Sequence, residues 1–178
     1  MSDLIDDYQN GLVDLTDQYT DPIEAAYRRY ADGDLDDDEA AAVITVAVLT
    51  AASRASALAD LTASTWLTGM DRADVLPLGI TTTVDAADVK ALLDDRDGPG
   101  RLLSMLRART YDAAAATWST VIQTRAPLKR WTRRTENTNC KVCNGLANGH
   151  QLAMSTPMYR HTGCRCVQQP TEEGNTHA

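Results

Sequence analysis

The four cysteines of this chain lie close together near its C-terminal end. They fall within 27 residues, as the pair Cys140 and Cys143 and the pair Cys164 and Cys166, with His161 just before the second pair. Two thiolates separated by two residues can turn toward one metal ion, and a closed structural zinc site takes four such ligands. Five candidates therefore compete for four places. Cys140, Cys143 and Cys164 are placed first, and the fourth ligand is either His161 or Cys166.

The alternative to a metal site is a pair of disulfides or four free thiols. Disulfides would join Cys164 to Cys140 or to Cys143. The first ten residues contain no basic region followed by an apolar one, so the sequence predicts no secretory signal and synthesis in a cytoplasm. Paired cysteines in such a protein favour a metal site. Small sulfur-rich tetrahedral sites favour zinc over iron, and binding would supply on the order of 10 kcal/mol of folding free energy.

Catalytic interpretations of the same residues do poorly. A zinc deaminase needs an H-x-E motif upstream of its C-x2-C motif, whereas His150, His161 and His177 all follow Cys143. The chain also lacks the H-E-x-x-H motif of metalloproteases. His150 is an isolated loop histidine, which we expect to be solvated. Because four protein ligands leave no open position on zinc, the site is predicted to be structural and the protein not to be an enzyme.

A basic segment containing one tryptophan lies just before the cysteines. Its candidate contact residues for nucleic acid or a partner are Arg125, Lys129, Arg130, Trp131, Arg133 and Arg134. The arginines could hold phosphates while Trp131 stacks on a base. The alternative is that Trp131 packs within the metal-binding module and the arginines face solvent or an acidic protein surface. Packing of Trp131 is favoured over stacking on a base, because a single aromatic ring is not a stacking platform.

Charge is distributed unevenly along the chain. Residues 1–40 carry a net charge of −11, residues 41–100 carry −4, and residues 101–178 carry +7. The net charge of −8 argues against nucleic-acid binding by the whole molecule, but the basic last third allows it locally. The acidic first forty residues could bind a basic partner or repel DNA, or they could simply be solvated.

The remaining sequence predicts long helices. Apolar residues at helical spacing indicate helices over 4–19, 22–30, 37–67, 85–95 and 101–125. Proline at position 22 and the Asp97–Gly100 segment are interpreted as helix boundaries. The most apolar stretch, residues 40–52, is too short to cross a bilayer.

These observations predict a mainly α fold. The two long helices are expected to form an antiparallel pair with the N-terminal helices packed across it. The expected domains are a helical body over residues 1–127, a zinc-knuckle-like module with short strands over residues 128–170, and a polar tail over residues 171–178.

The last third of the chain, from about Arg107 to Val167, resembles the C-terminal domain of phage Mu F-like minor head proteins, also called head morphogenesis proteins. The resemblance lies in four linked features. They are an Ala-rich helix beginning with Arg109-Thr110, Trp131 in a basic strand, Cys140-x2-Cys143 followed by Gly145, and the closing His161-x2-Cys164-Arg165-Cys166. The closing motif together with the upstream tryptophan and C-x2-C pair is more specific than either half alone.

This resemblance implies a virion component. Proteins of the family are associated with the portal vicinity or capsid interior, with head assembly and with DNA delivery. The expectation is therefore a non-enzymatic minor capsid protein, made in the host cytoplasm, that docks on the portal or the major capsid protein and not on a membrane. Its basic last third could contact packaged DNA. The alternative is a small zinc-containing nucleic-acid-binding protein.

Overall fold

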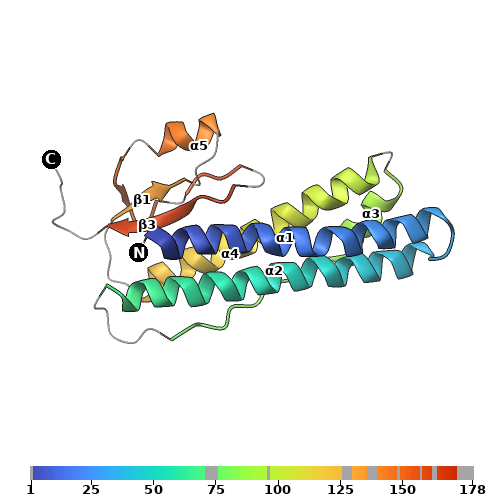
Figure 1. The fold of residues 1–178 in the computed structure, drawn as a ribbon, viewed down its shortest axis with the longest axis horizontal. Coiled ribbons are helices and arrows are strands. Elements are labelled where there is room, and N and C mark those ends of the chain that lie inside the picture. The colour runs from blue at the N-terminus through green and yellow to red at the C-terminus, as the bar shows by residue number, and fades with distance from the viewer. Residues whose placement is uncertain are drawn as a thin grey trace.

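The computed structural model describes residues 2–70, 76–95, 97–125, 130–135, 140–147, 149–156, 158–161 and 164–171. The elements are α1 (Ser2–Ala31), α2 (Asp37–Thr68), α3 (Ala86–Leu93), α4 (Gly98–Arg125), β1 (Arg130–Arg134), α5 (Lys141–Leu146), β2 (Leu152–Ala153) and β3 (Val167–Thr171). The mainly helical fold with a small C-terminal sheet is confirmed. A bundle of long helices carries the sheet at one end (Figure 1).

Helix α1 runs without interruption through Pro22, so the prediction of two separate helices was wrong. Proline removes one backbone donor and crowds the preceding turn. The ring of Pro22 is exposed, while Ile23 and Ala26 next to it are buried against α2 and its neighbours. We infer that burial of this face outweighs the lost hydrogen bond.

Helix α2 begins with a capping box formed by Asp36 and Glu39. The Glu39 amide donates to Asp36 Oδ1 at 2.8 Å, and the Asp36 amide donates to Glu39 Oε2 at 3.1 Å. This reciprocal capping box satisfies two backbone donors that a helix end would leave unpaired. Helix α4 starts three residues earlier than predicted, because its first turn accommodates Pro99, which needs no donor there.

The three long helices pack with α1 antiparallel to both α2 and α4. Helices α2 and α4 are parallel to each other, which corrects the expected antiparallel pair. Ile44 and Leu102, from the first halves of α2 and α4, share one core cluster, and Leu67 and Ile122, from their second halves, share the other. The segment that connects α2 to α3 runs back along the bundle. Helices α2 and α4 can therefore begin at the same end (Figure 1).

The returning segment is held by a buried carboxylate of α2. Asp60 is 2% exposed, and its two oxygens accept hydrogen bonds from the Leu78 amide at 3.0 Å and the Gly79 amide at 2.8 Å. One turn earlier, Ser56 Oγ donates to the Ile80 carbonyl at 3.2 Å. An acidic residue inside an Ala-rich helix is therefore satisfied by backbone donors rather than by a cation.

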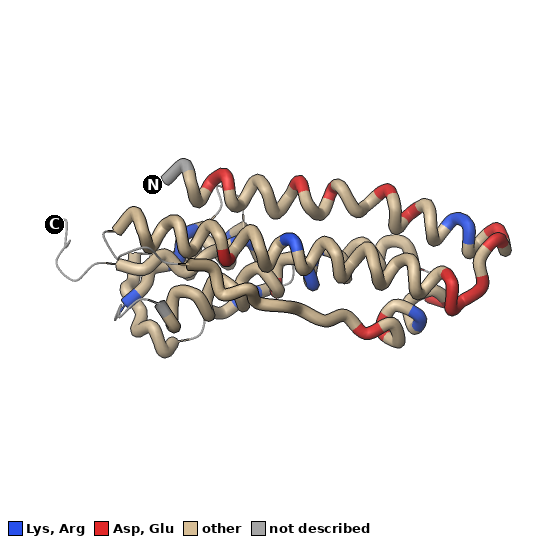
Figure 2. The backbone as a smooth tube through the Cα atoms, turned by 90° about the horizontal axis from the view of Figure 1, so that it is seen from below, with Lys and Arg blue, Asp and Glu red and all other residues tan. Residues whose placement is uncertain are grey.

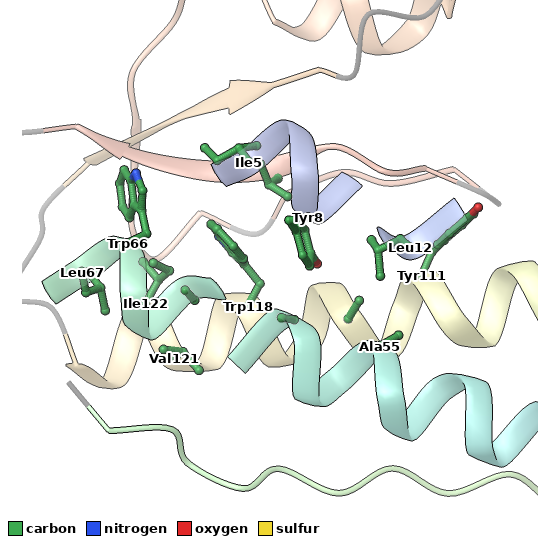
Figure 3. Close-up of a cluster of buried hydrophobic side chains, with 14 residues drawn as sticks. Ile5, Tyr8, Leu12, Ala55, Trp66, Leu67, Tyr111, Trp118, Val121 and Ile122 are labelled. Carbon is green, nitrogen blue, oxygen red and sulfur yellow. The ribbon is translucent and has the colours of Figure 1, made fainter. Parts of the chain in front are cut away.

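Small and aromatic side chains together fill the core. Alanines at four-residue spacing in α2 are almost fully buried, which lets neighbouring helices approach closely: Ala51, Ala55, Ala59 and Ala63. The ring centroids of Tyr8 and Trp118 lie 5.1 Å apart, in the core cluster that also contains Ala55 (Figure 3). Tyr8 and Trp66 are both almost fully buried.

By length and composition, α2 is the one described helix apolar enough to cross a membrane, which the sequence analysis did not anticipate. Sixteen of its residues are buried. The contacts with α1 and α4 cover part of that apolar surface, since 39% of the most apolar window of α2 is buried. Acidic residues instead follow α1 and the turn into α2 (Figure 2).

The C-terminal module is a three-stranded antiparallel sheet in the order β2–β1–β3, with α5 beside it. The module joins the bundle through the core. Val167 packs in the same cluster as Tyr8, and Trp118 Nε1 donates to the Gln168 carbonyl at 2.8 Å. Gln9 Nε2 also donates to the Arg165 carbonyl at 2.9 Å. Residues 126–129, at the expected domain boundary, and residues 172–178 of the expected tail lie outside the described residues.

We expect Asp60→Ala to lower the free energy of unfolding by about 3 kcal/mol, since two buried amides lose charge-assisted hydrogen bonds. Urea unfolding measures the loss, and hydrogen exchange should accelerate at Leu78 and Gly79. Asp38→Ala is the matched control, because Asp38 makes only an exposed ion pair with Lys90, and we expect less than about 1 kcal/mol. Equal losses in the two variants would contradict the anchoring role of Asp60.

Candidate metal centre

The first cysteine pair is positioned by the start of α5. Cys140 is the N-cap residue, and its Sγ accepts the Cys143 amide at 3.5 Å. This turn brings the Cys143 thiol to the side of the helix that faces the sheet, where it is buried.

The second pair approaches from the segment that enters β3. Cys143 Sγ lies 3.7 Å from Cys164 Sγ, and Cys166 completes a group in which the three sulfur atoms are within 4.8 Å of one another. Residues two apart in an extended segment point to the same face, so Cys164 and Cys166 can both face Cys143.

His161 lies on the other side of Cys143. Its Nε2 is 3.0 Å from Cys143 Sγ and 3.3 Å from Cys140 Sγ, and these three donor atoms form a second group within 4.8 Å. The five predicted ligands thus form two overlapping groups that share Cys143. They cluster closely enough to bind a metal ion.

The spacing of the sulfur atoms suits a tetrahedral ion. With zinc–sulfur bonds of 2.3 Å, tetrahedral geometry places two bound sulfurs about 3.8 Å apart. The distance of 3.7 Å between Cys143 Sγ and Cys164 Sγ agrees with this value. All four cysteines are free thiols, so neither of the expected disulfides is present.

The thiols differ strongly in acidity. A hydrogen bond from Cys166 lowers the pKa of Cys164 to about 4, and the same bond raises the pKa of Cys166. Burial raises the pKa of Cys143 to about 11, while the Cys143 amide lowers the pKa of Cys140. Without metal, the second pair therefore shares a proton as a thiol–thiolate hydrogen bond.

Two arginines approach Cys164. Arg133 is 9% exposed; its Nη1 lies 3.9 Å from Cys164 Sγ, and its Nη2 donates to the Tyr159 carbonyl. Arg160 Nη2 donates to the Cys164 carbonyl at 2.7 Å and to the Tyr111 carbonyl of α4 at 3.2 Å. The sequence analysis assigned Arg133 to the basic segment and missed Arg160, although its position four residues before Cys164 was a signal.

The basic segment does not present a stacking ring. Trp131 is 1% exposed, and its Nε1 donates to the carbonyls of Ala153 at 3.0 Å and Thr156 at 3.2 Å. Arg134 pairs with Asp6 of α1 at 3.0 Å. Arg130 is exposed. The side chain of Arg125 and all of Lys129 lie outside the described residues.

Comparison of the chain with protein-family models, with curated proteins and with solved structures finds no match. The chemistry of the centre therefore rests on its own geometry.

In metal-free protein at neutral pH, we expect iodoacetamide to modify Cys140 first. Its thiol is the only half-buried one, whereas the other three are almost fully buried, and its pKa is lowered, which favours the reactive thiolate. Peptide mapping by mass spectrometry follows the order of modification. Earlier labelling of Cys143 or Cys166 would contradict the described burial.

Proposed function

We propose that the C-terminal module holds one structural zinc ion and that the protein is a non-enzymatic minor capsid component. The observation that carries the zinc proposal is the convergence of four free thiols and one imidazole around Cys143. The residues fit a zinc ion, because the donor set is sulfur-rich and offers at least four ligands. Bound there, zinc would cross-link α5 to the segment entering β3.

The composition of the module's interior supports a structural role. Beside the two clusters of the bundle, the third buried cluster consists of Cys143, Cys164 and Cys166, with Cys140 and Met158 packed against it. Thiols that bury one another contribute little more than small apolar side chains do. A bound ion would instead supply on the order of 10 kcal/mol to this part of the fold.

We expect protein purified without chelator to contain one zinc per chain, with its thiols unreactive until the metal is removed. Elemental analysis and thiol titration measure both quantities. Chelation should increase proteolysis within residues 130–171 while the helical circular dichroism of the bundle persists, because the bundle has its own core.

A metal content near zero, with four immediately titratable thiols, would refute the zinc proposal. A cooperative loss of all helicity on chelation would contradict the separate stability of the bundle.

The capsid proposal rests on the resemblance of the last third to phage Mu F-like minor head proteins. The features that carry it belong to adjoining elements: Trp131 lies in β1, and the two cysteine motifs lie in α5 and before β3. The helix start implied at Arg109-Thr110 is not observed, because α4 begins at Gly98 and contains this pair in its interior. In the proposed role, the helical body docks on the portal or inner capsid during head assembly. The module, held by the metal, then faces packaged DNA with Arg130, the candidate contact residue that is exposed among the described ones.

The outer face of α2 is the docking surface we propose on the helical body. It exposes Val43, Val46 and Leu61, with Val46 63% and Leu61 58% exposed. The one arginine of this helix, Arg54, is drawn toward α1, where its guanidinium lies 5.7 Å from the centre of the Tyr19 ring and 3.4 Å from Gln18 Oε1. An exposed helix face with so little charge suits an apolar partner surface.

We expect the protein to be retained by the portal protein of the same phage at moderate salt, and Val46→Asp with Leu61→Asp to reduce retention at least tenfold. A buried carboxylate at an apolar contact is costly, whereas the exposed positions leave folding stability nearly unchanged. Pull-down measures retention, and thermal melting checks folding. Val142→Asp on α5, also an exposed valine, is the matched control.

Absence of retention by both portal and major capsid protein would count against the capsid proposal. Salt-sensitive binding of the free protein to DNA, lost with Arg130→Ala, would favour the nucleic-acid-binding alternative.

A further inference from the structure

Two positive charges lie beside Cys164, and no carboxylate in the described part of the chain pairs with them. Arg133 is buried, and Arg160 is partly buried and donates to two backbone carbonyls. Among the described residues, neither guanidinium forms an ion pair. A buried arginine normally faces an anion, because removing its charge from water is otherwise expensive.

The anion next to these arginines is the thiol cluster itself. Arg133 Nη1 contacts Cys164 Sγ at 3.9 Å, and Arg160 contacts the carbonyl of the same residue. A divalent ion bound by four thiolates carries a net charge of −2, whereas three thiolates and a neutral imidazole give −1. The two guanidiniums, with a charge of +2, balance the centre with four thiolates. Beside a centre with three thiolates and an imidazole they would leave a surplus positive charge.

We infer that the metal is held by Cys140, Cys143, Cys164 and Cys166, and that His161 stays outside as a hydrogen-bond donor to the thiolates. This inference rests on the proposed zinc site and selects which of the five candidates is not a ligand. It requires Cys140 Sγ to move toward Cys164 and Cys166 when the metal binds, because Cys140 is grouped with Cys143 and His161 and not with the second pair. Arg133 and Arg160 are then positioning residues, which stabilise the charge of the centre without touching the ion.

The position of His161 supports the same assignment. A nitrogen and a sulfur bound to one tetrahedral zinc lie about 3.5 Å apart. His161 Nε2 is closer than that to both Cys143 Sγ, at 3.0 Å, and Cys140 Sγ, at 3.3 Å. Both distances are within hydrogen-bond reach of sulfur, as expected of an N–H group shared between two thiolates.

Cobalt(II) bound to the full-length chain tests the ligand set, because its visible bands shift to higher energy when nitrogen replaces sulfur. We expect the native protein to give a four-sulfur spectrum. His161→Ala should keep that spectrum and lose at most about tenfold in affinity, as removal of an outer hydrogen-bond partner does. Cys166→Ser should shift the bands and lower cobalt affinity at least a hundredfold. His150→Ala is the control, since His150 belongs to neither group of candidate ligands.

A three-sulfur, one-nitrogen spectrum of the native protein that is lost in His161→Ala would overturn the inference but leave the zinc proposal standing. Failure of the native protein to bind cobalt or zinc would overturn both. The native spectrum gives an answer even if Cys166→Ser does not fold.

The arginines are tested by charge removal and charge conservation. We expect Arg133→Gln and Arg160→Gln each to weaken cobalt binding by about 10-fold to 100-fold with an unchanged spectrum. Arg133→Lys should recover part of the loss, which a purely structural role would not predict. Arg130→Gln is the exposed control. Equal affinities of Arg133→Gln, Arg160→Gln and Arg130→Gln would refute the charge-balance argument.

Discussion

The C-terminal module depends on the position of Cys143. Its thiol belongs to both groups of candidate ligands, so α5 and the segment entering β3 meet at one sulfur atom. Four free thiols and an imidazole form a weak apolar cluster, since thiols bury little surface and any two thiolates among them repel each other. In our proposal, Arg133 and Arg160 supply positive charge beside the sulfur atoms, and the ion supplies bonds to them.

The module is not an independent appendage, because three kinds of contact join it to the bundle. Val167 enters the bundle core, Trp118 donates to the backbone of β3, and Arg160 reaches the carbonyl of Tyr111 in α4. Arg160 also donates to the Cys164 carbonyl, so this arginine connects α4 to Cys164.

Sequence reasoning succeeded where a local signal determined the outcome. The long helices follow from apolar residues three or four positions apart, and each cysteine pair was recognised from the short spacing within it. The sequence-based predictions failed where the outcome depends on packing between segments that are distant in the sequence. The break at Pro22 did not occur, because burial of Ile23 and Ala26 holds the helix together, and the direction of α4 relative to α2 depends on a returning segment tied down by Asp60.

The amino-acid sequence by itself determined which residue types are available for chemistry, since spacing within a turn follows from covalent geometry. It identified the five donors and favoured the packing of Trp131 in the module, which is buried, but it did not predict that Arg133 and Arg160 face Cys164 or that α2 and α4 run in parallel. Only the tertiary structure decided these points. Each depends on which surfaces the helices bury against one another, and that choice is made by the whole core rather than by any segment of the chain.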